Sequence, residues 1–474
     1  MELEKDLAAR QEARELCRRA TLAQQQLANM EQGQLDRICQ AIAKAFSASA
    51  RELAELAVRE TGFGNTEDKT AKNIFASDTV WNAIKQMQTV GILKKDEERR
   101  VWQIGVPVGV IAAIVPSTNP TSTICYKALI ALKAGNSIVF SPHPKALSCS
   151  IRATQIVAEA AEAAGAPKGS ISCLRLGAMA GTQELMADPG IKLILATGGP
   201  AMVRAAYSSG KPAIGVGAGN GPAYIHHSAD VNRALECILR SKSFDNGTVC
   251  ASEQSIIVEK AMEQKVLSAA KSKGFYLMGQ EEAVKLSKLL FRPSGALNPE
   301  VVGKSAEKLA EMAGFSIPRG TKVLMAREEE AGPTRPYSME KLCPVLAFYV
   351  MQTEAQVLEK SVEILRHEGS GHTFCMHCED RTAIERFARK IPVSRFLVNT
   401  PAALGGIGKS TGLFPALTLG CGAVGGSSSS NNISPMDLIN IRRVAWDTDG
   451  SGDPLQPDSH MVEMLVARIM ERLR

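Results

Sequence analysis

One of the eleven cysteines, Cys250, has the surroundings that a nucleophile needs. It lies in the segment 244–254, among small and polar residues, directly before the apolar stretch Ser255–Val258. A cysteine where a loop meets a strand can be open to a substrate, and its thiolate can attack a carbonyl carbon. Taken alone, a lone cysteine is more often a buried core residue. The role of Cys250 therefore depends on the other motifs of the chain.

A second group of reactive residues has the spacing of metal ligands. The stretch 375–378 reads Cys-Met-His-Cys, and His372 lies just upstream. A structural zinc site would need a second pair of ligands, which is not evident. The alternation also fits a strand, on which the two cysteines would face opposite ways. We therefore expect no metal, and we interpret His226 and His227 as strand-end residues without a role.

Composition narrows the class of protein. The 474 residues are too many for one compact core, so two or three domains are expected. The net charge of +6 is too dilute to indicate a nucleic-acid partner. No apolar run reaches the roughly 18 residues of a membrane span, and the charged N-terminus lacks a signal-peptide core. Scattered single cysteines favour a reducing compartment, so we expect an intracellular, cytoplasmic protein.

Strand and helix patterns alternate between residues 110 and 200. The expected strands are 110–115, 137–140, 170–176 and 191–196, and the expected helices are 121–134, 145–164 and 182–187. Gly135 and Gly165 follow two of these helices, and Pro200 stands where another would start. Repeated units of this kind predict an α/β fold, a parallel sheet covered by helices that binds a nucleotide beyond the C-terminal ends of its strands.

The flanking segments have simpler patterns. Helices are expected over 5–60, a charged surface turn over 94–100, and a strand or hairpin over 101–108 with its turn near Gly105 and Pro107. A second α/β segment is expected over 224–420. Residues 425–432 are predicted to be a loop, either a flexible connector or a binding element. A strand over 438–446, a linker over 447–458 and a helix over 461–474 would follow.

Five motifs, in order over most of the chain, resemble the aldehyde dehydrogenase superfamily. They are Pro116-Ser117-Thr118-Asn119-Pro120, Thr197-Gly198-Gly199-Pro200, the glycine-rich stretch 215–222, Cys250, and Glu340-Lys341-Leu342-Cys343-Pro344. The resemblance implies that Cys250 is the nucleophile and that Asn119 supplies an oxyanion donor. It implies a Rossmann-type nucleotide-binding domain beside an α/β catalytic domain.

The resemblance also implies a set of nucleotide contacts. Glu340 would hold the nicotinamide ribose, and the pyrophosphate would lie near Gly198 and Gly199, although a plain turn is an alternative there. The residues expected to contact NAD or coenzyme A are Pro116, Ser117, Thr118, Ser141, Pro142, His143, Thr197, Gly198, Gly199, Val216, Gly217, Glu340 and Pro344.

Three departures from the superfamily pattern point to the coenzyme A-acylating branch. Val216 stands where hydrolytic members carry a glutamate base, and valine cannot deprotonate water. The loop 141–144 reads Ser-Pro-His-Pro where nucleotide-clamping members place Lys and Glu, which would leave room for the 3′-phosphate of coenzyme A. Gly371-His372-Thr373, 398–401 and 417–422 also resemble the acylating branch.

The sequence thus predicts an NAD-dependent oxidoreductase that converts a short-chain aldehyde, propionaldehyde or acetaldehyde, to acyl-CoA through a cysteine thioester. His372 is a candidate base for the coenzyme A step or, equally, a structural histidine. Sulfoacetaldehyde or succinate semialdehyde are alternative substrates. A hydrolytic aldehyde dehydrogenase, a semialdehyde-phosphate reductase and a non-catalytic microcompartment scaffold are the alternative functions. NAD is favoured over NADP because Ser141 supplies no cation for a 2′-phosphate.

The expected domains are a nucleotide-binding domain (1–223), a catalytic domain (224–424), an oligomerisation arm (98–109 with 425–447), a linker (448–460) and an amphipathic helix (461–474). The arm implies, by resemblance, a homodimer or a dimer of dimers. The helix resembles peptides that direct enzymes into bacterial microcompartments, where shell proteins would be its partners. Docking of this helix on its own enzyme is the alternative.

Overall fold

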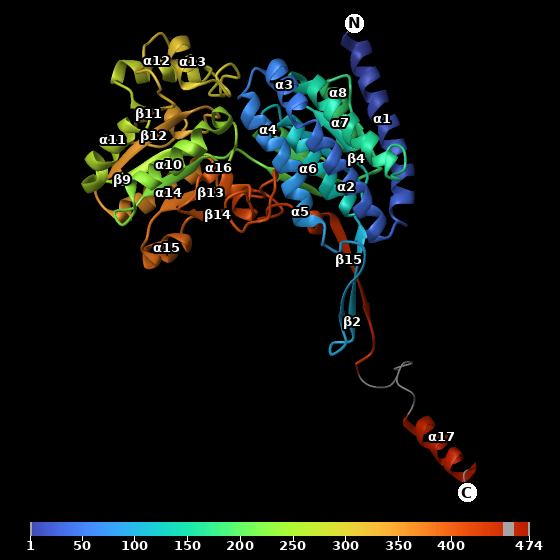
Figure 1. The fold of residues 1–474 in the computed structure, drawn as a ribbon. Coiled ribbons are helices and arrows are strands. Elements are labelled where there is room, and N and C mark those ends of the chain that lie inside the picture. The colour runs from blue at the N-terminus through green and yellow to red at the C-terminus, as the bar shows by residue number, and fades with distance from the viewer. Residues whose placement is uncertain (1, 449–458, 473–474) are drawn as a thin grey trace.

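The computed structural model describes residues 2–448 and 459–472, which form two lobes and a narrow arm (Figure 1). The first lobe contains a five-stranded parallel sheet in the order β5-β4-β3-β6-β7. Its strands are β3 (Val110–Val115), β4 (Ile138–Pro142), β5 (Ile171–Cys173), β6 (Ile191–Thr197) and β7 (Ala213–Val216). The parallel sheet expected from the alternating pattern is therefore confirmed.

Helices cover both faces of this sheet. They are α1 (Glu2–Leu27), α2 (Gln32–Ala48), α3 (Ala50–Thr61), α4 (Thr66–Ile74), the π-helix η1 (Phe75–Thr79), α5 (Val80–Ile84), α6 (Pro120–Lys133), η2 (Pro144–Ala146), α7 (Leu147–Ala163), α8 (Met179–Ala187) and α9 (Pro200–Tyr207). Alternate residues of β3 enter opposite cores. Ile111 and Ala113 pack with α2, α6 and α7, whereas Ala112 and Ile114 pack with α1 and α8. Continuous apolar strands are what two covered faces require.

The second lobe contains a seven-stranded parallel sheet in the order β10-β11-β12-β9-β8-β13-β14. Its strands are β8 (Gly221–Ile225), β9 (Glu253–Glu259), β10 (Phe275–Leu277), β11 (Val323–Arg327), β12 (Val345–Met351), β13 (Gly371–His377) and β14 (Val393–Val398). Its helices are α10 (Val231–Ser243), η3 (Phe244–Gly247), η4 (Lys260–Met262), α11 (Glu263–Ser272), α12 (Gln280–Leu290), α13 (Ala306–Ala313), η5 (Pro336–Ser338), α14 (Glu354–His367), α15 (Arg381–Ala388), α16 (Ala402–Gly406) and η6 (Ala423–Gly425). The last short helix, η7 (Pro435–Leu438), packs on the first lobe.

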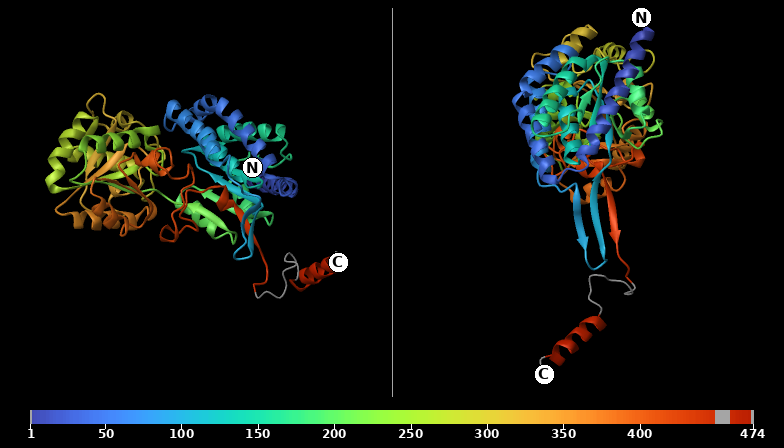
Figure 2. Two further views of the ribbon diagram at one scale, coloured as in Figure 1. Left: turned by 60° about the horizontal axis from the view of Figure 1, so that its bottom comes forward. Right: turned by 90° about the vertical axis from the view of Figure 1, so that its right-hand side faces the viewer.

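An antiparallel sheet of three strands forms the arm, which projects away from both lobes (Figure 2). It consists of β1 (Gly91–Asp96), β2 (Val101–Pro107) and β15 (Ile439–Ala445). The expectation of a turn near Gly105 and Pro107 is wrong, because β2 runs straight through both residues and the hairpin turns at 97–100. Gly105 is needed for a different reason: a Cβ there would lie 2.1 Å from the Thr89 carbonyl oxygen.

The chain passes to the second lobe after β7 and returns to the first lobe after β14. The loop 425–432 is docked there, since Ser427 Oγ donates to the Gly215 carbonyl at 2.8 Å and Ser428 Oγ donates to the Ala213 carbonyl at 2.6 Å. Residues 449–458, most of the expected linker, lie outside the described residues. Beyond them α17 (Ser459–Arg472) confirms the expected helix, and its Leu465 and Ile469 are more than half exposed. Within residues 2–448 and 459–472, none of the helices is both long and apolar enough to cross a membrane.

Candidate active site

A cavity of about 260 Å³ lies where the two lobes meet. The first lobe contributes the chain just beyond the C-terminal ends of β3, β6 and β7, and the second lobe contributes Cys250 and Glu340. The predicted site residues that line the cavity are Pro116, Ser117, Thr118, Asn119, His143, Thr197, Gly198, Gly199, Val216, Gly217, Cys250 and Glu340. The fold thus brings together residues that are more than 220 positions apart in the sequence.

A second cavity of about 450 Å³ continues from the first and contains Ser141 and Pro142. Both cavities share Pro116, His143 and the residues 197–200. Ser141 Oγ is already hydrogen-bonded to Thr182 Oγ1 at 2.8 Å. His143 is the only titratable residue that lines this second cavity within the described part of the chain, so its wall offers neither a carboxylate for a ribose nor a lysine or arginine for a phosphate.

The shared wall between the cavities is mostly backbone. Gly198 and Gly199 precede Pro200, the first residue of α9, and all three line the cavity at the N-terminus of that helix. A Cβ built on Gly199 or Gly217 meets no atom within 4 Å, although both residues line the cavity. A side chain there would enter the cavity itself. The absence of side chains at these positions therefore leaves a cradle that fits a pyrophosphate.

Cys250 lies three residues before β9 and is partly exposed. Its carbonyl oxygen lies so close to Gly219 that a Cβ on Gly219 would be 1.9 Å away, which fixes the glycine at that position. Burial, and to a smaller extent Glu340 and Cys421, raise the pKa of the Cys250 thiol to about 12, against a smaller opposing effect of Arg395. The resting thiol is therefore protonated at neutral pH, and its proton has to leave during the reaction.

Glu340 is the only carboxylic acid that lines the Cys250 cavity among the described residues. Its Oε1 accepts a hydrogen bond from the Gly219 backbone N–H at 2.8 Å. Burial and then the charge of Glu368 raise the pKa of Glu340 to about 8. The side chain is consequently neutral below that pH and becomes a carboxylate above it, when it also opposes ionisation of Cys250.

Asn119 stands directly before α6, at the position where an asparagine side chain usually caps a helix. It makes no capping hydrogen bond here. Its Nδ2 instead lies 3.2 Å from Thr118 Oγ1 and 3.4 Å from the Thr248 carbonyl oxygen, and its Oδ1 accepts a hydrogen bond from Lys72 Nζ. Both Nδ2 contacts are long, so an anionic oxygen beside Cys250 can replace either of them.

Two predicted site residues lie outside both cavities. His372 is fully buried on β13, where Nδ1 bonds to Thr373 Oγ1 at 2.8 Å, and burial followed by the charge of Arg395 lowers its pKa to about 3. Pro344 lies behind the cavity wall, with its carbonyl accepting from the Leu324 N–H at 2.9 Å. Contact of His372 with a thioester, and of Pro344 with a nucleotide, would both need a rearrangement of this structure.

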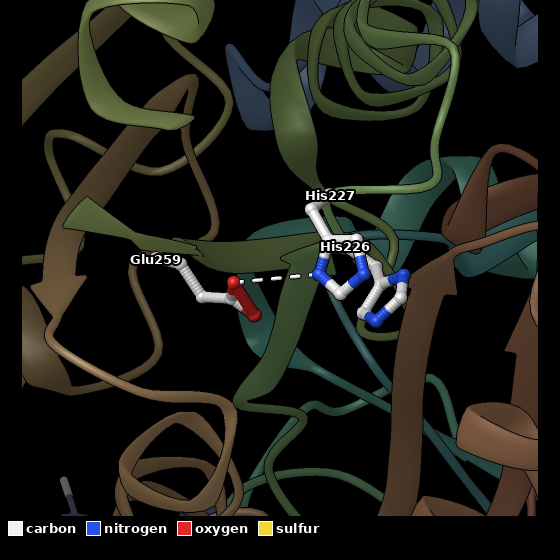
Figure 3. A group of neighbouring side chains, drawn as sticks. All are labelled: His226, His227 and Glu259. Carbon is white, nitrogen blue, oxygen red and sulfur yellow. Dashed lines mark ion pairs between the residues drawn. The ribbon is translucent and has the colours of Figure 1, made fainter. Parts of the chain in front are cut away.

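Two histidines and a glutamate gather where the central strands β8 and β9 of the second sheet end, at the end of β9 away from Cys250 (Figure 3). His227 Nδ1 lies 3.4 Å from Glu259 Oε2, and the ring centroids of His226 and His227 are 3.8 Å apart. His226 Nδ1 accepts from the Ser228 backbone N–H at 3.2 Å, so the ring proton of His226 is on Nε2. The stretch 375–378, weighed above for zinc, runs through the end of β13 and is buried.

Sequence reasoning missed Lys72, which lines the Cys250 cavity from α4. Two lysines one helical turn apart, Lys69 and Lys72, have the spacing of a solvated helix face. Both are buried, with 3% and 2% of their surface exposed, because α4 packs against the segment before Cys250. Ile407, Leu417 and Leu419 add an apolar part to the cavity wall.

Comparisons with known proteins agree with this geometry. The sequence model of the aldehyde dehydrogenase family matches residues 4–285. The bifunctional aldehyde-alcohol dehydrogenase of Escherichia coli (strain K12) is 44% identical over 91% of this chain and 49% of its own length. The chain therefore spans about half the length of that curated relative.

Two solved structures have the same fold over nearly their whole lengths. An acetylating aldehyde dehydrogenase from Geobacillus thermoglucosidasius is 48% identical, with a TM-score of 0.92 over 96% of this chain and 99% of that one. A propionaldehyde dehydrogenase from Rhodopseudomonas palustris, with bound coenzyme A and an acylated cysteine, is 28% identical, with a TM-score of 0.83 over 92% of this chain and 97% of that one.

Proposed function

Because the chain belongs to the aldehyde dehydrogenase family, we propose that it converts a short-chain aldehyde, NAD⁺ and coenzyme A to acyl-CoA and NADH. The observation that carries this proposal is the set of residues that line one cavity. Cys250 and Asn119 share a cavity with a glycine-lined nucleotide cradle, and Val216 stands at the end of β7 without a carboxylate to activate water. The thiol of coenzyme A ionises far more readily than water and its thiolate is a much stronger nucleophile, so it depends less on such a base.

The residues of the chain divide the chemistry among them. Cys250 Sγ forms a bond to the aldehyde carbon as its thiol proton leaves, and the carbonyl oxygen becomes an oxyanion. The Asn119 side-chain amide and the Cys250 backbone N–H stabilise that oxygen. When bound, NAD⁺ supplies the hydride acceptor and coenzyme A the acyl-accepting thiol. Gly198, Gly199 and Gly217 leave room for either nucleotide in turn.

The apolar part of the cavity favours a short aliphatic aldehyde, propionaldehyde or acetaldehyde. Ile407, Leu417 and Leu419 line it. A sulfonate or carboxylate on the substrate would need a free cation, and Lys72, the only lysine or arginine lining the cavity in the described chain, is paired with Asp245. NAD is favoured over NADP because no lysine or arginine lines the adjoining cavity beside Ser141 within the described residues.

The mechanism is tested by NADH formation from propionaldehyde and NAD⁺, with and without coenzyme A. Sustained turnover only with coenzyme A, and no more than one NADH per active site without it, supports the acylating function. Equal turnover in both would mean that water accepts the acyl group. Electrospray mass spectrometry of the protein without coenzyme A should then show the mass of a propionyl group on Cys250 in the first case only.

Assembly and location form the second part of the proposal. The arm carries exposed apolar side chains, among them Ile92, Ile441 and Val444, which suit a subunit interface of a dimer or a dimer of dimers. The exposed apolar residues of α17, Val462, Leu465, Val466 and Ile469, suit an address for a microcompartment shell. A protein ending at Trp446 tests the address. Full activity with loss of co-sedimentation with shells supports it, whereas a changed oligomeric state assigns α17 to the enzyme body.

A further inference from the structure

Lys72 joins the oxyanion donor to a buried cluster of charges behind the cavity. Its Nζ donates hydrogen bonds to Asn119 Oδ1 and Asp245 Oδ2, and lies 3.4 Å from Thr248 Oγ1. Only 2% of the lysine surface is exposed, and that part faces the Cys250 cavity. The ammonium group therefore sits one residue away from the reacting atoms.

Asp245 holds this ammonium in place. Its carboxylate is fully buried, and Oδ2 also accepts from Lys69 Nζ at 2.9 Å and from Thr248 Oγ1 at 2.6 Å. The left-handed backbone of Asp245 and Asn246, with φ of 47° and 52°, turns the carboxylate toward α4. Burial alone would raise the pKa of Asp245, but Lys72 and Lys69 outweigh that effect and lower it. The carboxylate is thus ionised. Burial lowers the pKa of Lys72 to about 8, against the opposing charge of Asp245, so the lysine is still protonated at neutral pH.

A charged lysine decides which way the Asn119 amide points. An ammonium group has donors and no acceptor, so only the amide oxygen can face it. The Asn119 Nδ2 group must then face away from Lys72, toward the loop that carries Thr248 and Cys250. Since the side chain does not cap α6, no other hydrogen bond to that helix fixes this orientation. Burying an ion pair costs more free energy than packing apolar side chains in the same place. The charged cluster is therefore better explained by its effect on the orientation of the Asn119 amide than by a contribution to the stability of the fold.

We propose that Lys72 is a positioning residue that fixes and polarises the Asn119 amide so that its N–H groups meet the oxyanion formed at Cys250. The inference rests on the proposed function, because it acts through the oxyanion step assigned there to Asn119. Withdrawal of electron density from Oδ1 by the ammonium makes the Nδ2–H groups stronger donors. Lys72 itself touches neither the aldehyde carbon nor the sulfur in this mechanism.

A double-mutant cycle between Lys72 and Asn119 tests the proposal. The readout is the rate of the single-turnover NADH burst with saturating propionaldehyde and NAD⁺ and without coenzyme A. Loss of an oxyanion donor lowers such rates by about 10²–10³-fold, so we expect that fall for Asn119→Ala and a fall of roughly 10–100-fold for Lys72→Met. In the Asn119→Ala background, Lys72→Met should change the rate less than about twofold, because the group it orients is gone.

The inference is wrong if Lys72→Met lowers the burst rate by the same factor in both backgrounds. It is also wrong if the Lys72→Met single variant keeps the full burst rate. Full activity in Asn119→Ala would instead remove the oxyanion assignment on which it rests, so the two failures are distinguishable. Lys69→Met separates the orienting of Asn119 from the loss of a buried lysine: it removes a lysine of similar burial from the same helix and the same carboxylate, but one that contacts the Thr118 carbonyl and not Asn119. Because Lys69 also pairs with Asp245, some loss is expected, but it should be smaller than for Lys72→Met and should be the same factor in the Asn119→Ala background.

Lys72→Gln keeps the inference testable if Lys72→Met does not fold. A glutamine amide can still donate to Asn119 Oδ1 but is uncharged and also has an acceptor, so this variant should recover only part of the burst rate that Lys72→Met loses. A Lys72→Gln enzyme that folds and binds NAD⁺ normally but is as slow as Asn119→Ala would contradict the orienting role.

Discussion

The two walls of the active-site cavity are built from different material. The wall from the first lobe consists of backbone and small residues, with Gly198, Gly199 and Gly217 beyond strand ends. The wall from the second lobe presents Cys250 and Glu340, and Lys72 of α4 is fixed beside them by a carboxylate of that lobe. A backbone wall can accept two different nucleotides in succession, whereas the reacting atoms need fixed side chains. This difference between the walls fits the proposal that one cavity serves two cosubstrates.

Removing the nucleophile should have the largest effect of any single change. Cys250→Ala should lower turnover on the order of 10⁶-fold, the usual cost of deleting a nucleophile, while NAD⁺ binding and the far-ultraviolet circular dichroism stay normal. Cys237→Ala removes a partly exposed cysteine elsewhere and should keep full activity. Residual turnover within about a hundredfold of normal in Cys250→Ala would mean that another group attacks the aldehyde.

Placing a carboxylate on the backbone wall should change the acyl acceptor. A general base contributes about 10²–10⁴-fold, so Val216→Glu should speed hydrolysis of the thioester by roughly 10²-fold and release acid without coenzyme A. Acid is measured by chromatography alongside NADH. Val216→Gln has almost the same size and no base, and it should stay dependent on coenzyme A. If the turnover of both variants remains strictly dependent on coenzyme A, the side chain at position 216 does not reach the thioester.

A side chain placed in the glycine-lined cradle should weaken the binding of NAD⁺ and of coenzyme A together. Gly199 has an ordinary φ of −64°, so Gly199→Val introduces no backbone strain, and its side chain should enter the cavity. We expect the KM for NAD⁺ and the KM for coenzyme A each to rise roughly tenfold, about 1.4 kcal/mol, with kcat less affected. Gly33→Val, at an open helical position, is the control. A rise for NAD⁺ alone would show that coenzyme A binds elsewhere.

The smallest expected effect concerns the charge of Glu340 on the side-chain wall. Glu340 raises the pKa of Cys250, so Glu340→Gln should lower that pKa and speed alkylation of Cys250 by iodoacetamide. Because the pKa of Glu340 is about 8, the wild-type carboxyl is neutral at lower pH and the two rates should agree there. Above pH 8 the variant should react about two- to tenfold faster. If the ratio of the two alkylation rates stays the same from acidic to alkaline pH, the charge of Glu340 does not influence the ionisation of Cys250.

Sequence patterns foresaw the elements of the first lobe well, because their signals are local. Gly135 has a φ of 72° directly after α6, as a helix-ending glycine should, and Pro200 begins α9. Most of the cavity residues were also foreseen, since each follows a strand end or belongs to a motif with a fixed place. The role of each side chain stays a prediction until the variants above are measured.

Three features could not be foreseen because they depend on distant contacts. The Lys69 and Lys72 pair looked like a solvated helix face, and only packing against Asp245, more than 170 residues away, buries it. Gly105 looked like a turn, but it serves a close approach to the Thr89 backbone. His372 was a plausible base on its motif alone. It is buried on β13 because the loop that carries Cys421 packs over Gly371, the residue next to it.

The pairing of β2 with β15 has a consequence for how the chain is made. β15 aligns Ile439 with Pro107 and Ala445 with Val101, so the arm joins segments from the two ends of the enzyme body. During synthesis β2 emerges early, and its partner leaves the ribosome only after both lobes have been translated. Until then β2 has one open edge, which is a site for mispairing between nascent chains. The arm is therefore complete only late in synthesis. Any contact that the three-stranded arm makes between subunits has to wait until β15 has been synthesised.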